Sequence, residues 1–131
     1  MRVLVTGSEG HIGQVLAETL REAGHEVRTM DRVARHREKP GEHLAGDLRD
    51  SSAVRQAVQG VEAVAHLGAI PHDRAGSPED VLTVNVQGTL NVLLACVEAG
   101  VGRLIYFSSI NALGCVGGYR PAQYFPIDDA Y

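Results

Sequence analysis

The chain opens with Val3-Leu4-Val5-Thr6-Gly7-Ser8-Glu9-Gly10-His11-Ile12-Gly13, a short apolar run followed by three glycines spaced three residues apart. The run is rich in β-branched residues and predicts a strand that is covered on both faces. From His11 to Ala23, apolar residues recur every three or four positions, and Gly24 supplies a typical helix end. A strand, a glycine turn and a helix therefore follow one another.

Each glycine has its own use in such a turn. Gly7 permits the sharp bend, Gly10 lets the backbone approach a diphosphate, and Gly13 lets the helix pack closely on the strand. Free amide groups at the helix start then face the anion, so His11 and Ile12 join the glycines as predicted cofactor contacts. A glycine triplet alone also fits a tight turn without a ligand, but its place between a strand and a helix favours a nucleotide.

Further strands and helices alternate along the rest of the chain. Strands are expected over residues 26–30, 43–45, 61–67 and 103–107, and helices from Asp50 or Ser51 to Val58 and from Ser77-Pro78 to Gly100. The last helix has more apolar positions than one stripe holds, so we expect both of its sides to be covered. This order predicts an α/β fold, a Rossmann-type doubly wound parallel sheet, in one domain over residues 1–131. The sheet is truncated after about five strands, where the full fold has about six.

Composition and charge exclude several other classes of protein. The 131 residues are 44% hydrophobic and 21% charged, as in soluble globular chains, and carry a net charge of −4. The basic residues are scattered along the chain, so no nucleic-acid partner is expected. Polar residues interrupt every long apolar stretch, and no signal region precedes the first strand, so we expect a cytoplasmic protein without a membrane span. Cys96 and Cys115 are expected to be reduced thiols.

Acidic residues follow the second and third expected strands. Asp31 lies about twenty residues past the turn, where a carboxylate accepts hydrogen bonds from the adenosine ribose and favours NAD over NADP. Arg32 and Arg35 follow it and are the alternative, since they suit a 2′-phosphate. Asp47 with Leu48 is either an adenine contact or a surface turn. No metal site is predicted, because His66, His72 and Asp73 lack ligand spacing.

Several motifs together resemble the extended short-chain dehydrogenases/reductases, the NAD-dependent epimerase/dehydratase family. They occur in the family's order and span essentially the whole chain: Gly7-x-x-Gly10-x-x-Gly13, Asp47-Leu48, His66-Leu67-Gly68-Ala69, Asn85-Val86-Gln87-Gly88-Thr89, and Tyr106-Phe107-Ser108-Ser109 with Asn111 and Gly114. The resemblance implies that Leu67, Gly68 and Ala69 pass beside the cofactor. It also implies that Asn85 supports the active site and that Ser108 lies near the cofactor.

The resemblance further implies hydride transfer from a sugar or nucleotide-sugar hydroxyl to NAD. In the family, a tyrosine acts as base, a lysine four residues later lowers the pKa of that tyrosine, and a serine orients the substrate. Ser109 fits the serine, with Ser108 as the neighbouring alternative. The Tyr-x-x-x-Lys pair is missing, because no lysine follows Lys39.

We therefore expect the chain to be the N-terminal part of such an enzyme, inactive alone, and to lack the catalytic helix and the substrate region. By the resemblance, the helix over residues 79–99 forms a homodimer. The rival hypothesis is a non-catalytic dinucleotide-binding module, such as a redox sensor or a scaffold. A reading frame that continues past Tyr131 into Tyr-x-x-x-Lys favours the enzyme.

Overall fold

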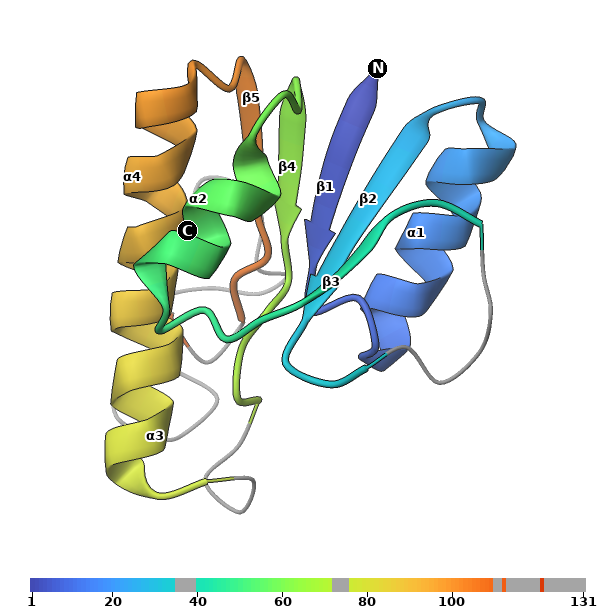
Figure 1. The fold of residues 1–131 in the computed structure, drawn as a ribbon. Coiled ribbons are helices and arrows are strands. Elements are labelled where there is room, and N and C mark those ends of the chain that lie inside the picture. The colour runs from blue at the N-terminus through green and yellow to red at the C-terminus, as the bar shows by residue number, and fades with distance from the viewer. Residues whose placement is uncertain (35–39, 72–75, 110–111, 113–120, 122–131) are drawn as a thin grey trace.

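A computed structural model describes residues 1–34, 40–71, 76–109, 112 and 121 of the chain. It confirms the predicted alternation of strands and helices (Figure 1). The strands are β1 (Arg2–Thr6), β2 (Glu26–Asp31), β3 (His43–Ala45), β4 (Ala63–His66) and β5 (Arg103–Tyr106). The helices are α1 (His11–Glu22), α2 (Ser51–Val58), α3 (Pro78–Leu82), the π-helix η2 (Thr83–Gly88) and α4 (Thr89–Ala99).

The five strands form one parallel sheet in the order β3-β2-β1-β4-β5. After β1 the chain moves outward through β2 and β3, then returns to place β4 on the other side of β1. The strand order therefore reverses between β1 and β4. In sheets of this kind, ligands bind at the carboxyl ends of the strands beside such a switch point.

Helices cover both faces of the sheet, with α1 on one side and α2 and α4 on the other (Figure 1). Leu4 and Val5 are both fully buried, and as neighbours in a strand they point to opposite faces. Leu4 belongs to the core beneath α2 and α4, whereas Val5 packs with Ala17 of α1. Ile12 and Val15 of α1 are exposed. The side of this helix that meets the sheet contains the buried Gly13 and Ala17 and the partly buried Leu16 and Leu20.

The long apolar helix predicted after Ser77 is present but contains a π-helical segment. Ser77 and Asp80 form a capping box at its start, and Gly100 ends it with a φ of 69°. Between α3 and α4, η2 adds one wide turn, a feature that often occurs at functional sites. Asp50, one of the two N-caps predicted for α2, is the cap in the structure. Its carboxylate accepts from the amides of Ser52 and Ala53.

Only one side of the long helix is covered in this chain, which corrects the expectation that both sides are. Val92, Ala95 and Cys96 are buried against the sheet and α2. The opposite side exposes large apolar residues, namely Leu82, Val86, Leu90, Leu93, Leu94 and Val97. Within the described residues, Pro78–Ala99 is also the one helix long and apolar enough to cross a membrane by length and composition alone. Only 22% of this apolar window is buried, because the side away from the sheet is exposed.

Gly13 is the residue that lets α1 approach the turn after β1. A Cβ atom at this position would lie 2.1 Å from the carbonyl oxygen of Gly7. We expect Gly13→Ala to lower the free energy of unfolding by about 3 kcal/mol, because the helix must move away from the turn. Urea unfolding followed by circular dichroism measures this loss.

Gly102→Ala is the matched control, since its Cβ would have only an ordinary contact at 3.6 Å, with the Glu62 carbonyl oxygen. Its effect is expected to stay below about 1 kcal/mol. Equal stabilities of the two variants would contradict the close approach at Gly13.

Candidate functional site

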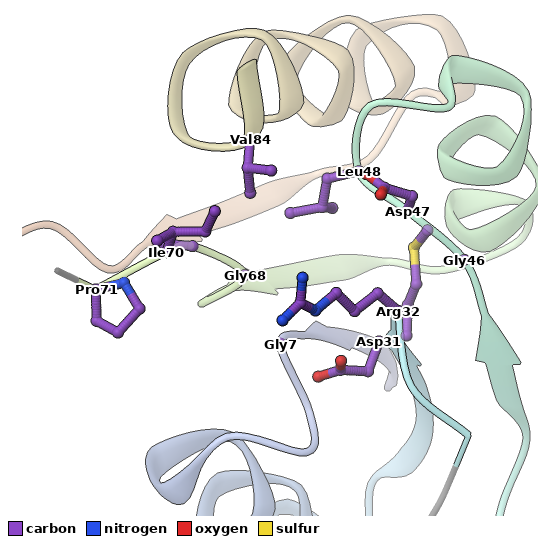
Figure 2. A pocket seen from close by; sticks show the side chains of 12 residues that line it. Gly7, Asp31, Arg32, Gly46, Asp47, Leu48, Gly68, Ile70, Pro71 and Val84 are labelled. Atoms are coloured by element: carbon purple, nitrogen blue, oxygen red, sulfur yellow. The ribbon is translucent and has the colours of Figure 1, made fainter. Parts of the chain in front are cut away.

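A cleft lies at the carboxyl ends of the strands, over the switch point between β1 and β4 (Figure 2). Its lining comes from the ends of four strands and from η2: Gly7, Met30, Asp31, Arg32, Gly46, Asp47, Leu48, Gly68, Ala69, Ile70, Pro71 and Val84. Seven of the residues predicted from the sequence are among them: Gly7, Asp31, Arg32, Asp47, Leu48, Gly68 and Ala69. The sheet therefore brings together residues from four separate segments of the sequence.

Backbone alone forms the floor of the cleft where β1 and β4 end. Gly7 has a φ of +68°, and a Cβ there would lie 2.7 Å from the amide nitrogen of Gly68. Left-handed backbone and this contact both require glycine. A Cβ at Gly68 would in turn lie 2.6 Å from Cδ1 of Leu48. The two facing glycines thus let the ends of β1 and β4 approach each other directly.

The start of α1 faces outward beside this floor. Gly10 is the N-cap residue and provides no side-chain hydrogen bond, and the first turn contains no acidic residue. His11 and Ile12 in that turn are exposed. An uncapped helix start with a partial positive charge and accessible amide groups is suited to bind an anion.

Asp31 joins the end of β2 to the glycine turn. One oxygen of its carboxylate accepts from the amide of Glu9 at 2.9 Å, and the other accepts from the amide of Val33 at 3.3 Å. A carboxylate has about four acceptor positions, so capacity remains for further donors. The Arg32 side chain extends from the same strand end into the space between Gly7 and Leu48 (Figure 2).

Asp47 and Arg49 form an ion pair at the far side of the cleft. The Arg49 guanidinium donates to the Asp47 carboxylate at 2.7 Å and contacts Asp80 of α3 at 3.1 Å. Hydrogen bonding from the Arg49 side chain lowers the pKa of Asp47 from its ordinary value. The carboxylate is therefore ionised at neutral pH and acts only as an acceptor.

The long helix holds two walls of the cleft through amide side chains. Asn85 accepts from the amide of Ile70 at 2.8 Å and donates to the carbonyl of the same residue at 3.0 Å. Asn91 donates to the Leu48 carbonyl at 2.8 Å. Asn85 does not line the cleft itself, so its effect on the cleft passes through Ile70.

Several predicted residues lie near the cleft without lining it: Gly10, His11, Ile12, Gly13, Leu67, Asn85, Ser108 and Ser109. Ser108 and Ser109 directly follow β5 at the same edge of the sheet and are exposed. Arg35, His72, Asp73, Asn111, Gly114, Cys115 and Tyr131 lie outside the described residues. Cys96 is a free thiol, and the described residues contain no cluster of three His, Cys, Asp or Glu side chains placed to hold a metal ion.

The sequence prediction missed five lining residues: Met30, Gly46, Ile70, Pro71 and Val84. Met30 and Gly46 each precede a predicted acidic residue by one position. Ile70 and Pro71 directly continue the segment from His66 to Ala69. Extending each motif by one or two residues would have found these four. Val84 enters the cleft through the path of η2, for which the sequence gives no comparable signal.

The chain is similar in sequence to a known family of enzymes. Residues 3–127 match the model of the NAD dependent epimerase/dehydratase family. A uronate dehydrogenase of Pseudomonas syringae pv. tomato is 36% identical over 142 residues, which cover 99% of this chain and 50% of that protein. The sterol demethylase protein B of Methylococcus capsulatus is 37% identical over 118 residues, covering 87% of this chain and 36% of the relative. The chain thus spans about a third to a half of the length of these relatives.

Solved structures share the fold and contain the cofactor. A variant uronate dehydrogenase from Agrobacterium tumefaciens, complexed with NAD, gives a TM-score of 0.75 at 33% identity over 82% of this chain and 40% of the other. The UDP-glucose 4-epimerase of Thermus thermophilus, also with NAD, gives 0.73 at 35% identity over 79% of this chain and 36% of the other. NAD is thus bound by these structural neighbours, and the family that matches this chain is NAD-dependent.

The Asp47–Arg49 pair makes a prediction about pH. We expect Arg49→Leu to raise the pKa of Asp47 toward its ordinary value of 3.8, because the hydrogen bonds from the guanidinium are lost. The lowered pKa of the folded chain stabilises it above the unfolded-state pKa, and this contribution is lost as pH falls through the folded pKa. The variant should therefore lose less stability than the wild type on acidification below about pH 4.

A carboxyl-detected NMR titration of Asp47 measures this shift. Arg55→Leu is the matched control, since Arg55 pairs with Glu98 on the surface, 3.6 Å away. An Asp47 titration that is the same in the wild type and in Arg49→Leu would refute the stated cause.

Proposed function

Since the chain belongs to the NAD-dependent epimerase/dehydratase family, we propose that it is the NAD-binding part of an epimerase, dehydratase or dehydrogenase that acts on a sugar or nucleotide sugar by hydride transfer. One observation carries the proposal: an uncapped helix start and a turn with glycines at positions 7 and 10 lie beside the switch point of the sheet. Bound NAD would supply the hydride acceptor for the oxidation of a hydroxyl group.

The diphosphate of NAD is assigned to the turn between β1 and α1. Gly7 and Gly10 leave room for it, and Gly13 keeps α1 close enough for the amides of the first turn to reach it. His11 and Ile12 contribute through their backbone amides, in agreement with their exposed side chains. The glycine spacing and the absence of a side-chain cap support this assignment.

The adenosine half is assigned to the ends of β2 and β3. Asp31 has acceptor capacity for the ribose hydroxyls and would repel a 2′-phosphate, which favours NAD over NADP. Arg32 extends over the same region, where it would lie beside the bound nucleotide. Asp47 and Leu48 lie on the opposite wall, where an ionised carboxylate and an apolar side chain suit the adenine amino group and ring.

The nicotinamide half is assigned to the end of β4, beside Leu67, Gly68 and Ala69, with Asn85 and Ser108 next to it. Ser109 is proposed to orient the substrate hydroxyl, because it follows β5 at the edge of the sheet that holds the cleft. The sequence contains no Tyr-x-x-x-Lys pair. The chain by itself therefore binds NAD without turnover, since no base is available to remove the hydroxyl proton.

A sugar-type substrate is supported by the relatives, although they differ among themselves. The neighbours include structures with UDP-glucuronic acid and with UDP-glucose beside NAD. Another relative is named a 3-beta-hydroxysteroid dehydrogenase, at 37% identity over 116 residues. Oxidation of a secondary alcohol by hydride transfer to NAD is the chemistry proposed for the complete protein.

Gly10→Val tests the diphosphate assignment. Gly10 is exposed, and a Cβ there meets only the Gly7 carbonyl oxygen, at 3.3 Å, so the fold tolerates a side chain at this position better than at Gly13. That side chain would occupy the space in front of the helix amides. We expect NAD affinity measured by calorimetry to fall at least about a hundredfold, while the melting temperature changes by only a few degrees.

Gly102→Val serves as the control. Gly102 directly precedes β5 and lies at the amino ends of the strands, whereas the cleft lies at their carboxyl ends. It should bind NAD like the wild type. If Gly10→Val retains wild-type affinity, the diphosphate does not bind at this turn.

The open side of the long helix is proposed to pair with a second copy of this helix in a homodimer. Leu82, Val86, Leu90, Leu94 and Val97 recur every three or four residues and are at least half exposed. Contiguous apolar surface of this kind typically marks an interaction site. Two identical faces satisfy the self-complementarity that a twofold interface requires.

Leu94→Glu should convert a dimer to a monomer, since it would bury two carboxylates against apolar side chains. Light scattering after size exclusion measures the change in mass. Val15→Glu, on the exposed side of α1, is the control and should leave the dimer intact. A monomeric wild-type chain would disprove this interface.

A further inference from the structure

A buried chain of polar side chains runs beneath the floor of the cleft. His66, at the end of β4, is 1% exposed. Its Nδ1 atom lies 2.7 Å from the Thr6 hydroxyl of β1, and its Nε2 atom lies 3.0 Å from the Thr89 hydroxyl at the junction of η2 and α4. The imidazole therefore links the two strands of the switch point to the long helix.

The hydrogen bonds at Thr6 and Thr89 favour one arrangement of the protons. The Gly68 amide donates to Thr6 Oγ1, whose own proton is then available to Nδ1 of His66. The Thr89 hydroxyl donates to the Asn85 carbonyl at 2.7 Å, so Thr89 Oγ1 accepts from Nε2–H. His66 is thus a neutral imidazole with its proton on Nε2.

Burial supports the neutral state, since it lowers the pKa of His66 to about 4. No carboxylate is among the hydrogen-bond partners or causes of the shift given for this ring, and the Tyr106 ring stacks on it with centroids 5.6 Å apart. An imidazolium would place a second proton against Thr6 and a charge in the core. The hydrogen bonds and the burial therefore favour the same state.

The series of hydrogen bonds continues from Thr89 to the wall of the cleft. Thr89 binds the carbonyl of Asn85, whose side chain holds both backbone groups of Ile70. Polar contacts thus connect Gly68 on the floor, through His66 and Thr89, to Ile70 on the wall. Asn85 lies within the wide turn of η2, and Thr89 directly follows that turn.

We propose that Thr6, His66 and Thr89 form a positioning relay that fixes the floor and the Ile70 wall before the nucleotide binds, which rests on the function proposed above. A wall that is already fixed costs less ordering when a ligand binds. Loss of the Thr89 hydroxyl leaves the buried Nε2–H of His66 unpaired and loosens the wall. NAD then binds more weakly without any change in the residues that contact it.

Thr89→Val tests the relay, because valine keeps the shape of threonine and removes the hydroxyl. We expect NAD affinity to fall about tenfold, as for a buried donor left unpaired. Thr89→Ser retains the hydroxyl and should restore affinity to within about threefold of the wild type. Thr83→Val is the matched control on the same helix, since the Thr83 hydroxyl binds only the carbonyls of Glu79 and Asp80 in the described contacts.

The state of His66 supplies a second measurement that needs no NAD. Nitrogen-15 NMR of the imidazole at neutral pH should show a neutral ring protonated on Nε2, and this signature should change in Thr89→Val but not in Thr83→Val. A ring protonated on Nδ1, or on both nitrogens, would overturn the relay. So would equal NAD affinities of Thr89→Val and Thr89→Ser.

The two proposals fail in different ways. A folded wild-type chain that binds no NAD contradicts the proposed function, and the tautomer of His66 then decides the relay alone. A chain that binds NAD but shows the other tautomer keeps its function and loses the relay.

Discussion

Direct contact between backbone segments at the end of β1 is the constraint on which the rest of the structure depends. Gly7 faces Gly68 of the neighbouring strand, and Gly13 packs on the Gly7 carbonyl, with no side chain between them. This contact draws the start of α1 to the switch point of the sheet. Without it, the helix amides would not face the cleft, and the cleft would lose the feature that suits a diphosphate.

The long helix supplies the second half of the arrangement. Its buried residues pack on the sheet, while Asn85, Thr89 and Asn91 attach three different segments at the carboxyl edge. One helix therefore sets the position of the Ile70 wall, the floor at His66 and the loop at Leu48. The opposite side of the helix is apolar and exposed. One side of the helix therefore organises the cleft, and the other is the side proposed to contact a second copy.

Local patterns predicted the strands, the helices and the glycine turn because each depends on residue type and spacing over short distances. They did not predict the exposure of Ile12 and Val15, because periodicity does not show which apolar residues of α1 meet the sheet. Nor did they predict η2, whose sequence fits an ordinary helix equally well. The place of Ile70 in the cleft depends on Asn85, a contact across 15 residues that periodicity does not encode.

Binding of the dinucleotide at the switch point can be tested by an amide-resolved NMR titration of the chain with NAD. We expect saturable shift changes concentrated in residues 7–13, at Asp31 and Arg32, and in residues 68–70. These segments are far apart in sequence and adjacent only at the switch point. Shift changes that are absent, or that concentrate on the open side of the long helix, would contradict the assignment of this cleft to the dinucleotide.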